Sequence, residues 1–328
     1  MDDGSRRAQL LSLKLAALVR DHQGSADGSQ PGQQPGEFGG GAALTVGSAA
    51  WVLLDAQPER GLGAALAWAL RREATELHVL AERSTGLLAR RAEGFGFPIT
   101  VWHVEGRTLL PAVAEPLPAP PAVDAAHDAW RATIVEGGAV PVVEHGVLAG
   151  EVEGLEVCRV VTDAYTDAVR LEVGVGAHDR EAFMMLHGDK PTVEALTGVV
   201  QAVSGHRRPG ADRHPLNMLA QERALRARLL VEPELIDAAT VAVAEPPVPR
   251  PNLKDAVPCV ALADIGGVAT AVVCSSGVDL DVVPYAVDAR SALGVDEAVI
   301  VLPARDALPV QQRLAALVQP PVRVVTVG

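Results

Sequence analysis

A segment near the start of this 328-residue chain recurs near its end, and this repeat constrains the fold more than any other feature. Between Gly61 and Gly106, adding 222 to a residue number reaches residues of matching chemistry at several positions without a gap. The matched positions include the apolar runs 77–80 and 299–302, Arg91 with Arg313, and Pro98 with Pro320. Self-similarity at a fixed offset indicates one structural unit that occurs twice. We therefore expect two similar units at the two ends of the chain, around a different middle.

The order of short apolar runs and amphipathic stretches predicts the kind of unit. In the first copy we expect strands at 42–46, 50–54, 77–80 and 99–104, and helices at 62–72 and 85–93. In the second copy we expect strands at 269–274, 298–302 and 322–327, and helices at 282–293 and 310–317. Strands that alternate with helices of about ten residues predict βαβ connections and a partly parallel sheet. The expected fold class is α/β, with two βαβ-containing units flanking an α+β middle domain.

Composition marks the boundaries between the parts. Segments rich in Gly, Ser and Gln behave as flexible chains, whereas Pro-rich segments are stiff and extended. The expected parts are an amphipathic helix at 1–22, a flexible linker at 23–41, the first repeat unit at 42–110, a Pro/Ala linker at 111–123, the middle domain at 124–244, a Pro-rich linker at 245–257 and the second repeat unit at 258–328. Asp124 is the expected N-cap of a helix at 124–135.

Charge and composition limit the function. The net charge of −13 disfavours nonspecific binding of nucleic acid, which requires Lys and Arg to neutralise phosphates. The three cysteines, Cys158, Cys259 and Cys274, lack the spacing of disulfide frameworks and zinc ribbons. No apolar run reaches the ~18 residues that span a bilayer. We therefore expect no membrane partner and a cytoplasmic location.

The N-terminal stretch 6–21 places Leu11, Leu15 and Leu18 at helical spacing, which predicts an amphipathic helix. Such a helix can dock on its own domain or bind a protein partner, and both alternatives stay open. A membrane-surface role is less favoured because the basic face of the helix is sparse.

Glu156 and Glu172 are the candidate catalytic and metal-binding carboxylates. They lie on predicted strands at 156–161 and 170–175, which a short polar turn joins. Carboxylates on neighbouring strands can share one Mg²⁺, and such an ion can activate water and hold a scissile phosphate. His178, shortly after the second strand, is the third catalytic candidate. The alternative is that these side chains only form the solvated face of a sheet or cap a helix.

This arrangement resembles the restriction-endonuclease-like nucleases, in which an acidic residue precedes a Glu-x-Lys on the following strand. The resemblance covers about thirty residues and implies metal-dependent cleavage of phosphodiesters. The chain departs from the pattern after Glu172, because Val173 and Gly174 follow and no lysine stands at the family's position.

An arginine-rich segment is the candidate anion-binding site. Its members are Arg207, Arg208, Arg213, Arg223, Arg226 and Arg228. Guanidinium groups bind phosphates and carboxylates in a bidentate manner. The segment has no aromatic residue on which a base could stack. The alternative is that carboxylates of the same chain pair with these arginines.

The common catalytic signatures Gly-x-Ser-x-Gly and His-Glu-x-x-His are absent from the sequence, and no cofactor is evident. We therefore expect a non-catalytic binding or assembly protein. One alternative is a divergent metal-dependent nuclease or nucleic-acid-associated protein that uses Glu156, Glu172 and the arginines of 207–228, with Mg²⁺ as its cofactor. Another is a regulator that binds a nucleotide or small molecule.

Overall fold

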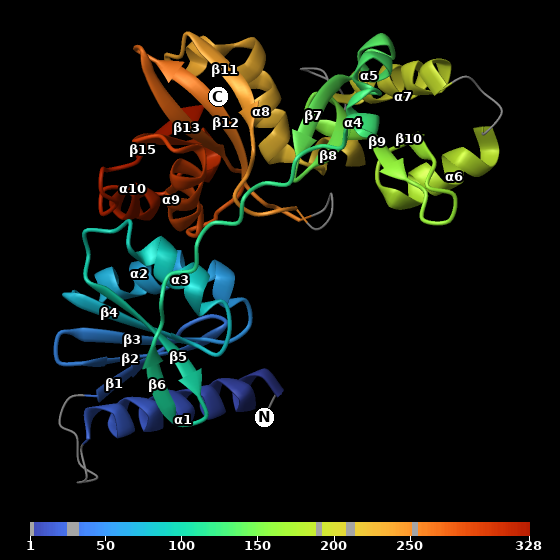
Figure 1. The fold of residues 1–328 in the computed structure, drawn as a ribbon. Coiled ribbons are helices and arrows are strands. Elements are labelled where there is room, and N and C mark those ends of the chain that lie inside the picture. The colour runs from blue at the N-terminus through green and yellow to red at the C-terminus, as the bar shows by residue number, and fades with distance from the viewer. Residues whose placement is uncertain (1–2, 25–32, 188–191, 208–213, 251–254) are drawn as a thin grey trace. The chain divides into compact units, whose positions relative to one another are not determined.

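The computed structural model describes residues 3–24, 33–187, 192–207, 214–250 and 255–328. The chain is a mixed α/β protein with three β-sheets (Figure 1). It divides into two compact units, each made of several segments of the chain. Unit 1 contains Met1–Leu117, Val278–Asp288 and Ala307–Val324, and unit 2 contains Pro118–Gly277, Ala289–Asp306 and Val325–Gly328.

Unit 1 is built on a six-stranded sheet whose spatial order follows the sequence. The outer pairs are antiparallel, whereas β3, β4 and β5 run parallel to one another. The strands are β1 (Gln33–Gly36), β2 (Gly41–Val46), β3 (Ala49–Leu54), β4 (Glu76–Ala81), β5 (Ile99–Glu105) and β6 (Thr108–Pro111). The parallel strands are connected by α2 (Leu62–Arg71) and α3 (Thr85–Ala92), as the alternation of strands and helices predicted.

Helix α1 (Asp3–Gln23) docks on the sheet of its own unit. Its buried side chains Leu15, Leu18 and Val19 join a core with residues of β2, β3, β4 and β5. Helix α1 covers one face of this sheet, and α2 and α3 lie on the other face (Figure 1). Of the two docking alternatives for the N-terminal helix, the structure therefore shows contact with its own domain.

Unit 1 also buries a group of ion pairs, here named the Arg91 cluster: Arg90, Arg91, Asp281 and Asp288. Arg91 lies 2.8 Å from Asp281 and 2.7 Å from Asp288, and Arg90 lies 2.9 Å from Asp288. The backbone N–H of Gly63 also donates to Asp281 at 3.1 Å. The cluster ties α3 to the segment 278–288, far away in the sequence.

Unit 2 contains an antiparallel four-stranded sheet in the order β10-β9-β8-β7. Its strands are β7 (Val140–Glu144), β8 (Val147–Val152), β9 (Leu155–Thr162) and β10 (Val169–Val173). The helices and 3-10 turns of this region are α4 (Ala125–Asp128), α5 (Arg131–Glu136), α6 (Ala177–His187), α7 (Thr192–Arg207), η2 (Pro215–Met218), α8 (Gln221–Val231) and η3 (Pro233–Ile236). One face of the sheet is apolar, and Leu148, Val160 and Leu171 pack there against Ile134 of α5 and Leu196 of α7.

The third sheet has five strands in the order β11-β12-β13-β14-β15. The strands are β11 (Thr240–Ala244), β12 (Cys259–Ile265), β13 (Val268–Cys274), β14 (Glu297–Pro303) and β15 (Arg323–Val327), and the associated helices are α9 (Val282–Leu293) and α10 (Pro309–Ala315). An antiparallel hairpin is followed by helix, parallel strand, helix and strand, which is the order from β2 to β5 in unit 1. The two α/β regions are thus broadly similar, while their residue-by-residue correspondence at offset 222 stays a prediction.

The elements differ from the expectations in several segments. Residues 33–36 lie in the predicted flexible linker but pair with β2 as a strand. The predicted helix at 124–135 is broken into α4 and α5, although Asp124 caps α4 by accepting from Ala126 N at 2.7 Å. Strands β6, β7, β8 and β11 were not predicted. Strands β7 and β8 form a hairpin, and β8 also pairs with β9.

Candidate functional site

The face of the four-stranded sheet opposite its apolar core is charged. Side chains alternate between the two faces of a strand, and directly paired residues point to the same face. Ala149 pairs with both Val142 and Arg159, and Arg159 pairs with Glu172. Glu144 follows Val142 by two positions and therefore shares this face. Strands β7, β9 and β10 thus bring charged residues together on this face of the sheet.

An irregularity in β9 adds Glu156 to the charged face. The pairing of β8 with β9 shifts by one residue at Gly150/Glu151, so that Glu151 pairs with Glu156. Without this extra residue, strict alternation from Arg159 would turn Glu156 towards the apolar core. A bulge of one residue moves every side chain beyond it to the other face of the sheet. Bulges commonly redirect a side chain in this way. The bulge therefore decides that Glu156 and Glu172 share one face.

Glu156 is held by guanidinium groups. Its Oε1 and Oε2 each accept from Arg159 at 2.9 Å, and Oε1 also accepts from Arg180 Nη1 at 2.9 Å. The Glu156 side chain is only 5% exposed. Bidentate pairs of this kind are among the strongest that a carboxylate makes. Both oxygens of the carboxylate are therefore engaged by side chains of the same chain.

Glu172 lies near Glu156 but is linked to it by an arginine. Arg180, from α6, approaches Glu172 Oε2 with its Nε at 3.6 Å while its Nη1 binds Glu156. Arg170 Nη2 donates to Glu172 Oε1 at 2.9 Å. The structure thus brings the two predicted metal ligands together around Arg180. Within the described part of the chain, no three His, Cys, Asp or Glu side chains gather as a metal site would require.

His178, the third catalytic candidate, does not join these carboxylates. Its side chain is fully exposed, and its Nδ1 lies 4.0 Å from Glu181 one turn further along α6. The neighbouring Asp179 accepts from the backbone N–H of Val175 at 2.7 Å, as an acidic residue at a helix start commonly does. His178 is therefore a surface residue of α6, and its catalytic role stays a prediction.

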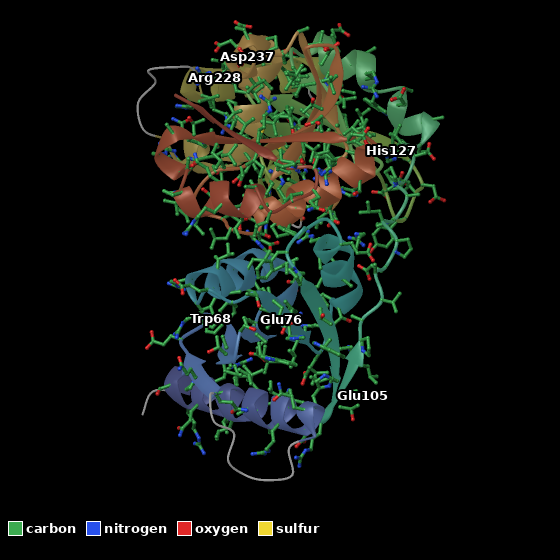
Figure 2. All side chains as sticks on the ribbon, turned by 90° about the vertical axis from the view of Figure 1, so that its left-hand side faces the viewer. Trp68, Glu76, Glu105, His127, Arg228 and Asp237 are labelled. Atoms are coloured by element: carbon green, nitrogen blue, oxygen red, sulfur yellow. The ribbon has the colours of Figure 1, made fainter. Side chains whose placement is uncertain are left out.

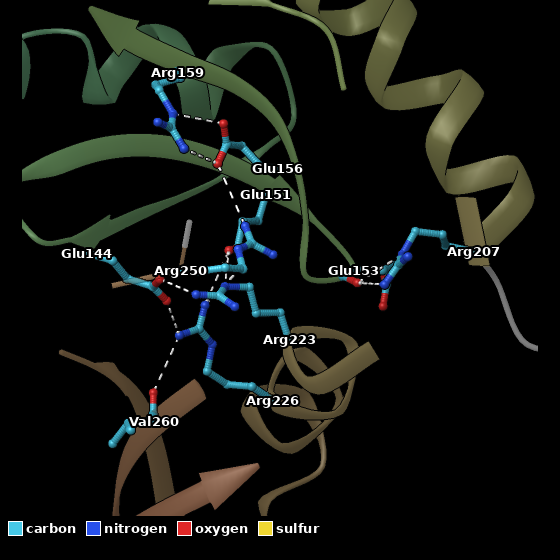
Figure 3. A network of polar contacts seen from close by, with 10 residues as sticks. All are labelled: Glu144, Glu151, Glu153, Glu156, Arg159, Arg207, Arg223, Arg226, Arg250 and Val260. Atoms are coloured by element: carbon cyan, nitrogen blue, oxygen red, sulfur yellow. Dashed lines mark hydrogen bonds and ion pairs between the residues drawn. The ribbon is translucent and has the colours of Figure 1, made fainter. Parts of the chain in front are cut away.

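Helix α8 contributes two of the predicted anion-binding arginines to the charged face (Figure 3). Arg226 Nη1 donates to Glu144 at 2.7 Å, and its Nη2 donates to Glu151 at 3.1 Å. Arg223 also binds Glu144, with its Nε 3.7 Å from Glu151. Both arginine side chains are at most 1% exposed. The alternative in which the arginines pair within the chain is thus what the structure shows at Arg223 and Arg226.

The opposite side of α8 is apolar and packs on the five-stranded sheet. Leu225 and Leu229 share a core with Cys259, Ala261 and Val272 of that sheet. Towards the other sheet, the turn after β8 approaches α8 at Gly154, where φ is 73° and a Cβ would lie 2.2 Å from the Arg223 backbone. Helix α8 therefore joins the two sheets of unit 2, with leucines on one side and arginines on the other.

Burial and ion pairing set the pKa of Glu144. Burial of its carboxyl would raise the pKa, but Arg223 and Arg226 outweigh this effect and hold the pKa below its ordinary value. The pKa of Arg226 is raised, because the nearby Cys259, Glu151 and Glu144 outweigh the effect of burial. Both groups are therefore charged at neutral pH, and their pairing is electrostatic as well as geometric.

The other predicted arginines lie elsewhere. Arg207 donates to the backbone carbonyls of Glu153, Leu216 and Leu219 at 2.6–3.1 Å. Arg228 lies on the exposed side of α8 and pairs with Glu232 at 3.2 Å (Figure 2). Arg208 and Arg213 lie outside the described residues. The described arginines of the segment 207–228 therefore do not form one surface.

A small hollow of about 130 Å³ opens on the charged face. Its walls include Val142, Val147 and Ala149 on the apolar side, three carboxylates, and Arg159, Arg223 and Arg250. Arg250 comes from the Pro-rich segment after β11 and is 8% exposed. Its Nη2 lies 3.9 Å from Glu156, which is beyond hydrogen-bond distance. Among the described residues, Arg223 Nη1 and Arg250 Nη1 are both buried without a hydrogen-bond partner.

Sequence reasoning missed several members of this group. It did not identify Glu144, Glu151, Arg159 or Arg250 as site residues. A usable signal was the His145-Gly146 pair between two alternating apolar stretches, which is typical of a hairpin and would have placed Glu144 and Glu151 on paired strands. No local signal identifies Arg250, because only the path of the Pro-rich segment brings it to the sheet.

We name the nine residues of this group the sheet-face cluster: Glu144, Glu151, Glu156, Glu172, Arg159, Arg180, Arg223, Arg226 and Arg250. Comparisons of the chain with protein-family models, curated proteins and solved structures found no match. The fold and the site thus define a mixed α/β protein with one charged sheet face. Among the described residues, none of the helices combines the length and the hydrophobicity that crossing a bilayer requires.

Proposed function

We propose that this chain is a non-catalytic binding protein whose ligand contacts the charged face of the four-stranded sheet. The observation that carries the proposal is that Arg159 and Arg180 engage both oxygens of Glu156. A carboxylate that binds Mg²⁺ must offer an oxygen to the ion, and here each oxygen already accepts charge-assisted hydrogen bonds. The hollow beside Glu156, with its unpartnered guanidinium nitrogens, supports a binding role.

The nuclease alternative makes an opposite prediction at the same residues. It requires Mg²⁺ to displace Arg180 from between Glu156 and Glu172. The test is incubation of the full-length protein with plasmid DNA and single-stranded RNA in millimolar Mg²⁺ or Mn²⁺, together with Glu172→Gln. We expect no cleavage above buffer. Cleavage that Glu172→Gln abolishes would overturn the proposal and support the nuclease.

Two further expectations accompany the proposal, one about the cellular location and one about a protein partner. Cys158, Cys259 and Cys274 are buried free thiols, which supports a reducing and therefore cytoplasmic environment. A protein partner at α1 would contact the side of the helix away from the sheet, where Leu10 and Leu13 are 61% and 62% exposed. A pull-down with Leu10→Glu/Leu13→Glu against the unchanged protein tests that partner, and equal recoveries would remove the helix from consideration.

A further inference from the structure

The sheet-face cluster contains one more cation than anion. Its five guanidinium groups (Arg159, Arg180, Arg223, Arg226 and Arg250) face four carboxylates (Glu144, Glu151, Glu156 and Glu172), a difference of +1. Arg170 does not change this sum, because it also pairs with Asp163. Glu245 is not part of this sum, because its contacts are with the backbone N–H of His145 at 2.6 Å and with His145 Nδ1 at 3.3 Å, not with the five guanidinium groups. Among the described residues of the cluster, the guanidinium groups thus outnumber the carboxylates that contact them by one.

Arg250 is the guanidinium group with the poorest pairing. Burial and the repulsion of Arg223 lower its pKa, and the more distant attraction of Glu156, Glu144 and Glu151 does not make up for them. Arg223 contacts Glu144 through its Nη2, whereas its Nε and Nη1 are buried without a hydrogen-bond partner among the described residues. Both side chains line the same hollow, and Figure 3 shows them beside Glu144 and Glu156. Buried N–H groups of this kind are costly unless an acceptor reaches them.

The walls and the size of the hollow select the acceptor. A volume of about 130 Å³ is well below the ~300–1,000 Å³ of pockets that take drug-sized ligands, so the hollow suits a small molecule. Val142, Val147 and Ala149 contribute apolar surface to the lining of the hollow. Glu144, Glu151 and Glu156 also line the hollow, and they repel a second negative charge on the ligand. These features favour a singly charged oxyanion with a short apolar body.

We infer that the hollow is a binding site for a small monocarboxylic acid. Its carboxylate accepts from Arg223 Nη1 and Arg250 Nη1, and its short apolar chain lies against Val142, Val147 and Ala149. The ligand supplies the negative charge that the sheet-face cluster lacks. This inference rests on the proposed function only in that it treats the charged face as a binding surface. It names the class of ligand that this surface takes.

The test uses the full-length protein and propionate as the probe. Sodium propionate is titrated while the melting temperature is recorded, with sodium chloride at the same ionic strength and neutral propionamide as controls. A ligand that binds only the folded state raises the melting temperature in a saturable manner. We expect this rise with propionate, a much smaller one with inorganic phosphate, and none with propionamide. Equal shifts with propionate and chloride, or with propionate and phosphate, would contradict the inference.

Variants locate the site. Arg250→Gln is expected to weaken apparent propionate affinity about tenfold or more, since it removes a charge-assisted hydrogen bond, while Arg250→Lys retains part of the affinity. Arg305→Gln, at an arginine that is 73% exposed in the same unit, is the matched control and should bind as the unchanged protein does. Ala149→Leu fills the hollow without changing a charge and should also weaken binding. If Arg250→Gln and Ala149→Leu bind propionate undiminished, the hollow holds only water and the inference fails.

This outcome is separate from that of the cleavage assay. Binding of propionate without cleavage supports both proposals. Metal-dependent cleavage together with propionate binding overturns only the proposed function, and absence of both overturns only the inference.

Discussion

Both units bury arginines beside carboxylates, but the two clusters differ in how completely their charges are paired. In the Arg91 cluster, two arginines face two aspartates, and no polar side-chain atom of these four described residues is buried without a partner. In the sheet-face cluster, five arginines face four glutamates, and guanidinium nitrogens stay unpartnered beside a hollow. Similar chemistry therefore produces a fully paired ion cluster in unit 1 and an incompletely paired ion cluster beside a hollow in unit 2.

The difference follows from the elements that carry the charges. Arg90 and Arg91 are adjacent on one short helix and meet Asp288 on another helix, so their pairing is compact. The sheet-face cluster collects residues from four strands, two helices and the Pro-rich segment. A pleated face spreads its side chains about 5–7 Å apart, which leaves space between them. An ion cluster on a sheet is thus more readily completed by a ligand than one between helices.

The largest expected effect is at the centre of the sheet-face cluster. Arg226→Met removes the partner that Glu144 and Glu151 share, and it leaves these buried carboxylates under-compensated. Loss of one partner from a buried pair costs about 3–5 kcal/mol in the free energy of unfolding. Urea denaturation measures this change, with the partly exposed Arg228→Gln as the control. A loss below about 1 kcal/mol would mean that the cluster does not hold α8 to the sheet.

A somewhat smaller effect is expected in the Arg91 cluster. Asp288→Asn keeps the shape of a fully buried side chain but removes the charge that Arg90 and Arg91 both contact. We expect a loss of about 3 kcal/mol in the free energy of unfolding, measured by urea denaturation beside the exposed Asp296→Asn. Because the charges of this cluster are fully paired, sodium propionate should not alter this loss in the free energy of unfolding. Rescue by propionate would show that the two clusters do not differ in the way described here.

The smallest expected effect is a change in pH dependence. The pKa of Glu144 is lowered in the folded state, so its stabilising contribution is present above its ordinary unfolded pKa and is lost as the pH falls through the folded value. The unchanged protein should therefore lose stability on acidification below about pH 4.5. Glu144→Gln should be about 2 kcal/mol less stable at pH 7 and should lose less on acidification. Parallel pH profiles for Glu144→Gln and the exposed control Glu234→Gln would contradict the pairing.

Local patterns predicted much of the two α/β regions. The run 299–302 is continuously apolar and the run 77–80 is interrupted only by His78, because parallel strands are buried on both faces, and this makes them visible in the sequence. The hairpin of β7 and β8 escaped prediction because its alternation is interrupted by Pro141 and by small residues such as Gly150. The strand at 33–36 escaped because its composition matches that of a linker.

The site was predicted only in part, and for a similar reason. Glu156 and Glu172 were singled out correctly as neighbours, yet their shared face depends on the shift at Gly150/Glu151, which no spacing rule shows. Arg223 and Arg226 were singled out as an anion site because they are close in sequence to Arg207. Their partners Glu144 and Glu151 lie about 75–82 positions away along the chain.

The amino-acid sequence by itself determined the α/β class, the order of elements in the two similar regions, and the absence of any long apolar segment. These properties depend on periodicity and composition, which act over a few residues. The tertiary structure alone decided which charges meet, because a side chain's partner depends on strand register, on one bulge and on the path of α8. It also decided that Arg250 enters the charged face with no carboxylate of the described residues within hydrogen-bond distance. That single unbalanced charge is the feature from which a ligand can be inferred.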